Sequence, residues 1–138
     1  MTSAGLYIAV VDDEAPVRTA LGRLLRLADY EVAAFGSGDE LLASLTVRVP
    51  ACVILDVHMP GISGFSVQAQ LRAANFEIPA VFITASDEPG LVASVADAHG
   101  VALLRKPFTN DQLLKAVSAA LGTPPGVTSC SQNPVMKQ

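Results

Sequence analysis

The chain has 138 residues, of which 51% are hydrophobic and 16% are charged, and its 13 acidic and 9 basic residues leave a net charge of −4. This length fits one compact domain, and the apolar content excludes intrinsic disorder for the body of the chain. The negative charge has the wrong sign for a surface that binds nucleic acid directly.

The apolar segments of the chain are short. The longest unbroken runs, at 6–11 and 51–55, fall far below the roughly 20 residues that a membrane-spanning helix requires. Residues 1–6 carry no positive cluster and lead directly into the first run, so they lack the pattern of an export signal. We therefore expect no membrane association and a cytoplasmic location.

Apolar runs recur along the chain without alternating with polar residues. Runs of this length, rich in Val and Ile, are typical of strands covered on both faces, as in a parallel sheet. The second run is the least hydrophobic and follows Glu31, so we expect it to be an edge strand. The predicted strands occupy 6–11, 32–35, 52–55, 80–83 and 101–104.

Segments with helical periodicity separate these runs. After the first run, apolar residues form one stripe of an amphipathic helix, and Pro16 is suited to its first turn. Weaker stripes at 67–71 and 91–95 predict two further helices, and a stripe at 113–121 predicts the last. The residues of the first stripe are Val17, Leu21, Leu24 and Leu25.

Several helix boundaries carry sequence signals. Two pairs of residues match the capping box, in which two side chains satisfy unpaired backbone donors reciprocally, so helices are predicted to start near 38 and 110. Gly100 and Gly122 are suited to end two of the helices. The capping pairs are Ser37 with Glu40 and Thr109 with Gln112.

The alternation of strands and helices predicts a doubly wound α/β fold. The pattern is (βα)₅, with a five-stranded parallel sheet in the flavodoxin-like order 2-1-3-4-5 and a ligand crevice at the carboxyl ends of the strands. Three of the nine prolines follow Gly122, and no periodic apolar residues do. We therefore predict a domain over 1–122 and a C-terminal tail or linker over 123–138.

Residues able to do chemistry end or directly follow four of the predicted strands. They are Asp12, Asp13, Asp56, Thr84 and Lys106. Because the carboxyl ends of parallel strands meet at one edge, these side chains are expected to converge. Three gathered carboxylates repel one another unless a cation neutralises them, and an all-oxygen ligand set favours Mg²⁺.

The same residues favour phosphoryl chemistry. A lysine ammonium pairs with one phosphoryl oxygen, and a threonine hydroxyl donates to another. Asp56 is the predicted nucleophile, because it stands alone at the end of the most apolar strand and carboxylates can form acyl phosphates. Taken singly, each residue also suits an ordinary role as a helix cap, a strand end or a surface charge. Taken jointly, they favour the functional interpretation.

Four motifs add a family resemblance: ValValAspAspGlu at 10–14, LeuAspValHisMetProGlyIleSerGly at 55–64, PheIleThrAla at 82–85 and LysProPhe at 106–108. In order and spacing they resemble the receiver domain of bacterial two-component response regulators. The resemblance covers about residues 6–121 and is closest to receivers attached to helix-turn-helix transcription regulators. Transcription regulation is therefore one expected output, although these 138 residues contain no such output domain.

The resemblance implies a role for each acidic residue. Asp56 would be the phosphoacceptor, taking a phosphoryl group from a phosphohistidine on a sensor histidine kinase or a phosphotransfer protein. Mg²⁺ would be bound directly by Asp13 and Asp56, through water by Asp12, and by the backbone carbonyl of His58.

The resemblance also implies a switch. Lys106 would pair with the phosphoryl group, Thr84 would move its hydroxyl to it, and the Lys106–Pro107 bond would be cis. Phosphorylation adds roughly −1.5 to −2 charge, which can pull both side chains inward and shift a conformational equilibrium that controls partner binding. The usual output surface of the family would lie at about 89–121.

Two positions depart from the family pattern. Leu103 stands three residues before the lysine, where the family usually has Tyr or Phe. Either Leu103 packs in the core and output uses other contacts, or the switch is lost. AlaHisGly at 98–100 stands where many relatives have Ala-Gly-Ala, which predicts a reshaped turn after the fourth helix.

Two alternatives to a phosphorylated receiver remain open. A pseudo-receiver would bind partners without being phosphorylated, which Leu103 would allow. A small haloacid-dehalogenase-type phosphohydrolase would also use an aspartyl phosphate and Mg²⁺, but such enzymes have a second Asp two residues after the nucleophile, and Glu14 occupies the corresponding position after Asp12.

The favoured interpretation is a signalling module and not an enzyme, because it would catalyse only its own phosphorylation and dephosphorylation. Its output would reach a downstream protein or an output domain of its own. A phosphorylation-dependent dimer is a further expectation.

Overall fold

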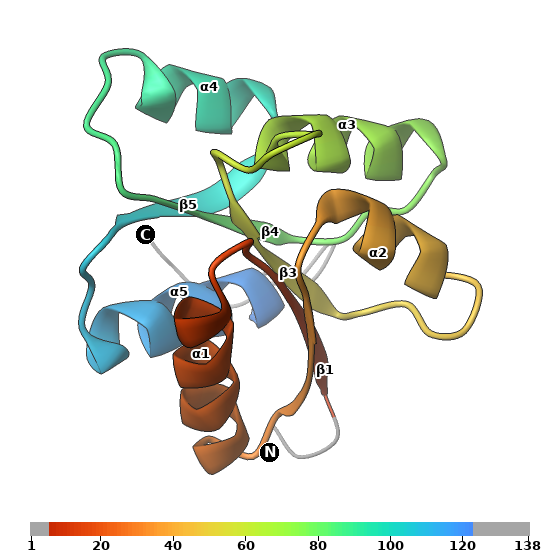
Figure 1. Ribbon diagram of the computed structural model, residues 1–138, viewed down its shortest axis with the longest axis vertical. Helices are drawn as coiled ribbons and strands as arrows, with labels where there is room; N and C mark the ends of the chain where they lie inside the picture. Colours follow the sequence, from red (N-terminus) through yellow and green to blue (C-terminus); the bar gives the residue numbers. More distant parts are fainter. Residues whose placement is uncertain (1–5, 123–138) are drawn as a thin grey trace.

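The computed structural model describes residues 6–122, in which strands and helices alternate along the chain (Figure 1). The pattern is the predicted (βα)₅. The elements are β1 Tyr7–Val11, α1 Ala15–Leu27, β2 Glu31–Phe35, α2 Gly38–Ser44, β3 Cys52–Asp56, α3 Gly64–Ala73, β4 Ala80–Thr84, α4 Leu91–Asp97, β5 Gly100–Arg105 and α5 Asn110–Leu121.

The strands form one parallel sheet in the order β2-β1-β3-β4-β5, as predicted. Every residue of β1, β3 and β4 is buried, which explains why their sequences are apolar without alternation. The two outer strands, β2 and β5, are partly exposed. The prediction that the second strand lies at an edge is therefore confirmed.

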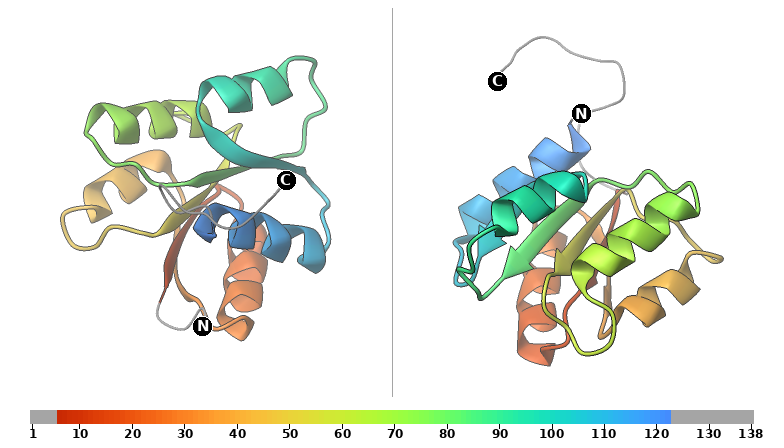
Figure 2. Two further views of the ribbon diagram at one scale, coloured as in Figure 1. Left: turned by 180° about the vertical axis from the view of Figure 1, so that it is seen from behind. Right: turned by 90° about the horizontal axis from the view of Figure 1, so that it is seen from above.

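The sheet separates two hydrophobic cores (Figure 2). Helices α1 and α5 cover one face, and α2, α3 and α4 cover the other. Leu25 and Leu113 are fully buried in the first core, and Leu41, Leu71 and Phe82 are fully buried in the second. Each such side chain contributes about 1.5–3 kcal/mol relative to an exposed position, so both layers are held firmly against the sheet.

Helix α1 forms as its apolar stripe predicts. Leu21 and Leu25 are buried, while Val17 and Leu24 pack at the margin of the same core. Pro16 lies in the first turn, where its missing N–H removes no helical hydrogen bond.

The two predicted capping boxes have different outcomes. At the start of α5, Thr109 Oγ1 accepts from the Gln112 N–H and Gln112 Oε1 accepts from the Thr109 N–H, so this box is complete. At the start of α2, Ser37 Oγ accepts from the Glu40 N–H, but Glu40 Oε1 accepts from the Gly36 N–H instead of the Ser37 N–H. The capping box predicted for Ser37 and Glu40 is therefore only half formed, although both helices start where expected.

Of the two glycines predicted to end helices, one does so and the other does not. Gly122 is the residue that caps the end of α5, as expected. Helix α4 instead ends at Asp97, and His99 adopts the left-handed conformation, with a φ of 61°. Gly100 belongs to β5, where a side chain would contact Phe82 at 2.7 Å. Gly100 is therefore required by packing against the sheet and does not end the helix.

None of the helices in the described part of the chain is long and apolar enough to cross a bilayer. The tail or linker predicted over 123–138 lies outside the described residues.

Candidate functional site

The sheet gathers the predicted chemical residues at the carboxyl ends of its strands. Asp12 directly follows β1, Asp56 ends β3, Thr84 ends β4 and Lys106 directly follows β5. The parallel arrangement brings residues far apart in the chain to one edge: Lys106 Nζ lies 2.9 Å from Asp12 Oδ2, although 94 positions separate them. The convergence predicted for these residues is therefore confirmed for Asp12, Asp56 and Lys106.

Three carboxylates form a cluster at this edge. Oxygen atoms of Asp12, Asp13 and Asp56 all lie within 4.8 Å of one another. Asp12 and Asp56 are buried and Asp13 is exposed, so the cluster opens to solvent on the side of Asp13. The cavity at this edge is lined by Asp13 and Asp56 but not by Asp12.

Lys106 is the only cation that the described residues place in this cluster within ion-pair distance of it. Its Nζ lies 2.9 Å from Asp12 Oδ2, 3.1 Å from Glu14 Oε1 and 3.4 Å from Asp56 Oδ2. The Lys106 side chain is 16% exposed, and those of Asp12 and Asp56 are 0% and 6% exposed. The pairs with Asp12 and Asp56 are therefore weakly screened by solvent, whereas the Glu14 side chain is 59% exposed and its pair is screened more.

Negative charges outnumber positive charges in this cluster, and the pKa of Asp56 is raised. Burial, together with the negative charge of Asp12, raises the pKa of Asp56 from 3.8 to about 6, against the attraction of Lys106. Burial lowers the pKa of Lys106, but its hydrogen bonds to Asp12 and Glu14 outweigh burial and raise that pKa to about 12. Lys106 therefore stays charged while Asp56 is costly to ionise.

This donor set fits a hard divalent cation. Among the described residues it offers carboxylate oxygens and no nitrogen or sulfur ligand. Mg²⁺ commonly binds through one or two carboxylates while keeping several waters. Asp12, Asp13 and Asp56 are the residues that could hold such an ion.

The backbone around Asp56 is tightly fixed. The His58 N–H donates to Asp56 Oδ1 at 3.2 Å, and the Gly64 N–H donates to the Val57 carbonyl at 3.2 Å. A Cβ atom at Gly64 would lie 2.5 Å from the backbone oxygen of Asp56. Gly64 therefore lets the start of α3 approach the end of β3, and this approach orients the aspartate.

Thr84 and Pro107 lie beside the cluster. Thr84 is buried, and its Oγ1 accepts from the Ser86 N–H at 3.0 Å, so its hydroxyl is tied to the loop after β4. The Lys106–Pro107 peptide bond is cis, as the resemblance implies. A cavity of about 380 Å³ lies at the cluster and is lined by Asp13, Asp56, His58 and Lys106, among others.

Comparison with known proteins decides the family. The family model of the response regulator receiver domain matches residues 8–118. The chain belongs to this family. Receiver domains are parts of two-component response regulators. Members of the family bind Mg²⁺ at an acidic pocket, and the acidic cluster of this chain consists of Asp12, Asp13 and Asp56.

Curated relatives share this receiver. The chain is 39% identical over 118 residues to Nodulation protein W of Bradyrhizobium diazoefficiens, covering 86% of the chain and 52% of that protein. It is 34% identical over 125 residues to the response regulator protein TodT of Pseudomonas putida, covering 91% of the chain and 55% of that protein. The chain thus spans about half the length of the curated relatives that it matches.

Solved structures agree with the fold. A response regulator receiver protein from Burkholderia phymatum is 40% identical, with a TM-score of 0.77 over 88% of this chain and 99% of that one. A Vibrio cholerae chemotaxis protein is 28% identical, with a TM-score of 0.77 over 86% of this chain and all of that one (100%).

Leu103 fills the place at which this receiver departs from the family pattern. It pairs with Phe82 across β4 and β5 and packs against the core beneath α2, α3 and α4. Leu103 is partly buried and packs against the core, as the first alternative expects, and whether the switch is retained stays a prediction. In the turn after α4, His99 is left-handed, with a φ of 61°, and exposed.

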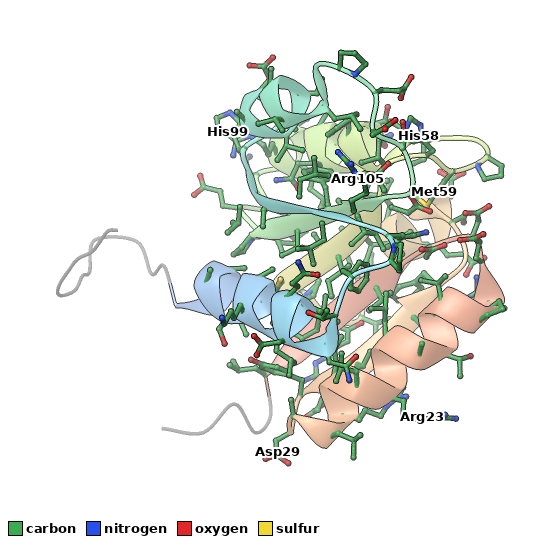
Figure 3. All side chains as sticks on the ribbon, turned by 90° about the vertical axis from the view of Figure 1, so that its left-hand side faces the viewer. Arg23, Asp29, His58, Met59, His99 and Arg105 are labelled. Carbon is green, nitrogen blue, oxygen red and sulfur yellow. The ribbon has the colours of Figure 1, made fainter. Side chains whose placement is uncertain are left out.

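Two features of the site were missed in the sequence. Glu14 is the third carboxylate that pairs with Lys106. Its position directly after two aspartates at a strand end is the sequence signal that could have identified it. His58 Nε2 lies 3.1 Å from Glu88 Oε1, which joins the loop after β3 to the loop after β4 at the rim of the cavity (Figure 3 labels His58). No spacing rule connects residues 30 positions apart in two loops, so the second feature had no sequence signal.

Proposed function

We propose that this receiver takes a phosphoryl group onto Asp56 from a phosphohistidine of a sensor histidine kinase or phosphotransfer protein, in a reaction that depends on Mg²⁺. The observation that carries the proposal is the position of Lys106 Nζ, 3.4 Å from Asp56 Oδ2 and 2.9 Å from Asp12 Oδ2, beside an open carboxylate cluster. A nucleophile, a fixed cation and a metal-binding acid pair are together what phosphoryl transfer to a carboxylate requires.

The proposed step forms a bond between phosphorus and a carboxylate oxygen of Asp56 and breaks the bond between phosphorus and the imidazole nitrogen of the donor. The imidazole leaves with the electron pair and takes a proton from water. Mg²⁺, held by Asp13, Asp56 and the backbone carbonyl of His58, with Asp12 acting through water, would neutralise charge on the transferred group. Lys106 supplies the fixed positive charge that aligns the group.

The switch that we propose follows from the bonds of the resting site. Lys106 is shared among three carboxylates, and a phosphoryl group on Asp56 would compete for it with roughly −1.5 to −2 charge. The Thr84 hydroxyl can exchange the Ser86 N–H for a phosphoryl oxygen, which would move the loop before α4. Leu103 and Pro107, next to these residues on β5 and after it, would repack as the output surface shifts.

An apolar groove beside the site suits the kinase. It has a volume of about 460 Å³ and is lined mainly by Val17, Ala20 and Leu24 of α1 and by Pro107 and Phe108 of the segment after β5. We propose that helices of the phosphodonor pack into this groove, because it places the donor beside Lys106 and offers the apolar surface that a stable interface needs.

The rest of the proposal concerns the whole protein. The domain spans 1–122, and 123–138 continues as a tail or linker. Output passes to a downstream protein or to an output domain, which the length of the relatives supports, and phosphorylation favours a dimer. The module acts in the cytoplasm, turns over no external substrate and does not itself bind DNA.

The test is direct phosphorylation. The protein is incubated with Mg²⁺ and acetyl phosphate, and its intact mass is measured for the wild type, for Asp56→Asn and for Asp97→Asn, which changes an exposed carboxylate outside the site. We expect one phosphoryl adduct on the wild type and on Asp97→Asn and none on Asp56→Asn. An equal adduct on all three proteins would reject Asp56 as the acceptor, and no adduct on any would favour the pseudo-receiver.

The phosphohydrolase alternative is not supported, because the family model that matches the chain is that of the receiver. Steady release of phosphate from unrelated phosphomonoesters in the same assay would be needed to revive it.

A further inference from the structure

A second groove lies on the opposite side of α1 from the apolar groove, between this helix and the open edge of β2. Its volume is about 540 Å³. Gly22 and Ala34 are among the small residues that leave room for it, and Arg18, Arg23 and Arg26 supply its polar side chains. This basic groove shares no lining residue with the phosphorylation site.

The charges of the basic groove are not balanced by acids. Arg18 Nη1 donates to the Asp12 backbone carbonyl at 2.8 Å, and Arg26 Nη2 donates to the Val32 carbonyl at 3.3 Å. Arg23 projects outward from α1 (Figure 3). Among the described residues, no carboxylate lies within ion-pair distance of these three arginines. A local positive surface therefore exists on a chain whose net charge is −4.

The edge of β2 offers backbone groups to the same groove. The Glu31 N–H donates to the Leu6 carbonyl and the Phe35 carbonyl accepts from the Asp12 N–H, so the peptide groups of these residues face β1. In a parallel strand the alternate residues, Val32 and Ala34, then face the open edge. Arg26 Nη2 reaches this edge through a long, exposed hydrogen bond to the Val32 carbonyl. Such an edge can pair with an added strand.

We propose that the basic groove binds an acidic, extended segment of a partner protein, which adds to the open edge of β2 while its carboxylates pair with Arg23 and Arg26. The added strand would replace Arg26 at the Val32 carbonyl and release the guanidinium for a carboxylate. Strand addition supplies affinity through the main chain, and alternate side chains supply selectivity. Guanidinium groups are suited to this pairing because they bind carboxylates with two parallel hydrogen bonds.

A short acidic segment fits better than nucleic acid. A long polyanion is repelled by the net charge of −4 of the whole chain, whereas a segment of a few residues contacts only the groove. The backbone N–H and C=O groups of the open strand edge match those of a peptide strand and do not match a sugar-phosphate backbone.

The test measures binding of a fluorescein-labelled peptide of alternating Glu and Val, eight residues long, to the full chain by fluorescence anisotropy. We expect saturable binding that weakens as NaCl rises from 50 to 500 mM, and no binding of the matching Lys and Val peptide. The double variant Arg23→Ser with Arg26→Ser should weaken binding about tenfold. The control, Arg72→Ser with Lys115→Ser, removes the same charge elsewhere and should bind as the wild type does.

Strand addition is tested without changing the protein. A version of the Glu and Val peptide that is N-methylated at alternate residues cannot donate along one edge, and it should bind at least about tenfold more weakly. Equal binding of the methylated peptide, equal weakening by the control variant, or tighter binding of a DNA duplex than of the peptide would each overturn the proposal. Circular dichroism of both double variants checks that they are folded.

Discussion

The cost of ionising Asp56 makes a prediction about stability. In Asp56→Asn a neutral amide replaces the carboxylate, and the amide resembles the protonated acid in size and charge. Because burial and Asp12 raise the pKa of Asp56 from 3.8 to about 6, the folded protein disfavours the charged form relative to the unfolded chain. We therefore expect Asp56→Asn to be more stable than the wild type at pH 8 in the absence of divalent cations.

The size of this effect follows from linkage. A rise from 3.8 to about 6 corresponds to about 3 kcal/mol, at about 1.36 kcal/mol per pKa unit, and this figure already includes the attraction of Lys106. Between these two pH values the folded state binds more protons than the unfolded state, so the stability of the wild type falls as the pH rises. The advantage of Asp56→Asn should be near zero below pH 3.8, grow up to pH 6 and stay constant above it.

Urea denaturation with EDTA, at pH values from 3.5 to 8, measures this difference. Asp97→Asn serves as the control, because its carboxylate is exposed and a surface change of this kind alters stability by about 0.5 kcal/mol or less. A variant no more stable than the wild type at pH 8, or an advantage that grows as the pH falls, would refute the account of Asp56 as a carboxylate destabilised by burial.

Four further predictions concern other parts of the structure. Lys106→Gln removes the attractive charge and should raise the pKa of Asp56 above 6, as measured by NMR titration of its carboxyl carbon. Gly64→Ala should lower the free energy of unfolding by about 2–3 kcal/mol, because its Cβ would lie 2.5 Å from a backbone oxygen; wild-type stability in urea would contradict this. His99→Gly should raise the stability by about 1 kcal/mol by removing a side chain from a left-handed position, and an unchanged melting temperature would count against it. Thr109→Ala should lower the free energy of unfolding by about 1 kcal/mol, and Thr109→Ser should restore most of the loss if the capping box is the cause.

The layered fold could be predicted from the sequence because burial on both faces imposes a distinctive pattern. The three inner strands are apolar throughout, and the stripe on α1 repeats with helical spacing. Both signals are local and come from residues that are neighbours in the chain. They predict the alternation of strands and helices, and the strand order, with Asp12, Asp56 and Lys106 at one edge, then follows from the common arrangement of doubly wound folds.

The remaining details depend on contacts that no local pattern reports. Gly100 was expected to end a helix, but its position is fixed by Phe82 on the neighbouring strand. Glu40 was expected to complete a capping box, but its carboxylate bonds the Gly36 N–H, one residue earlier. The pair of His58 and Glu88 depends on how two loops are placed by the ends of β3 and β4. Each of these outcomes is decided by tertiary structure.

The bond from Lys106 to Asp12 spans 94 positions, and this distance has a consequence for synthesis on the ribosome. The acids of β1 and β3 emerge from the exit tunnel well before the lysine that follows β5. A nascent chain halted before that point carries clustered negative charges with no ammonium to offset them and lacks an edge strand of the sheet. The cluster of Asp12, Asp56 and Lys106 is therefore complete only when translation of the domain is nearly finished.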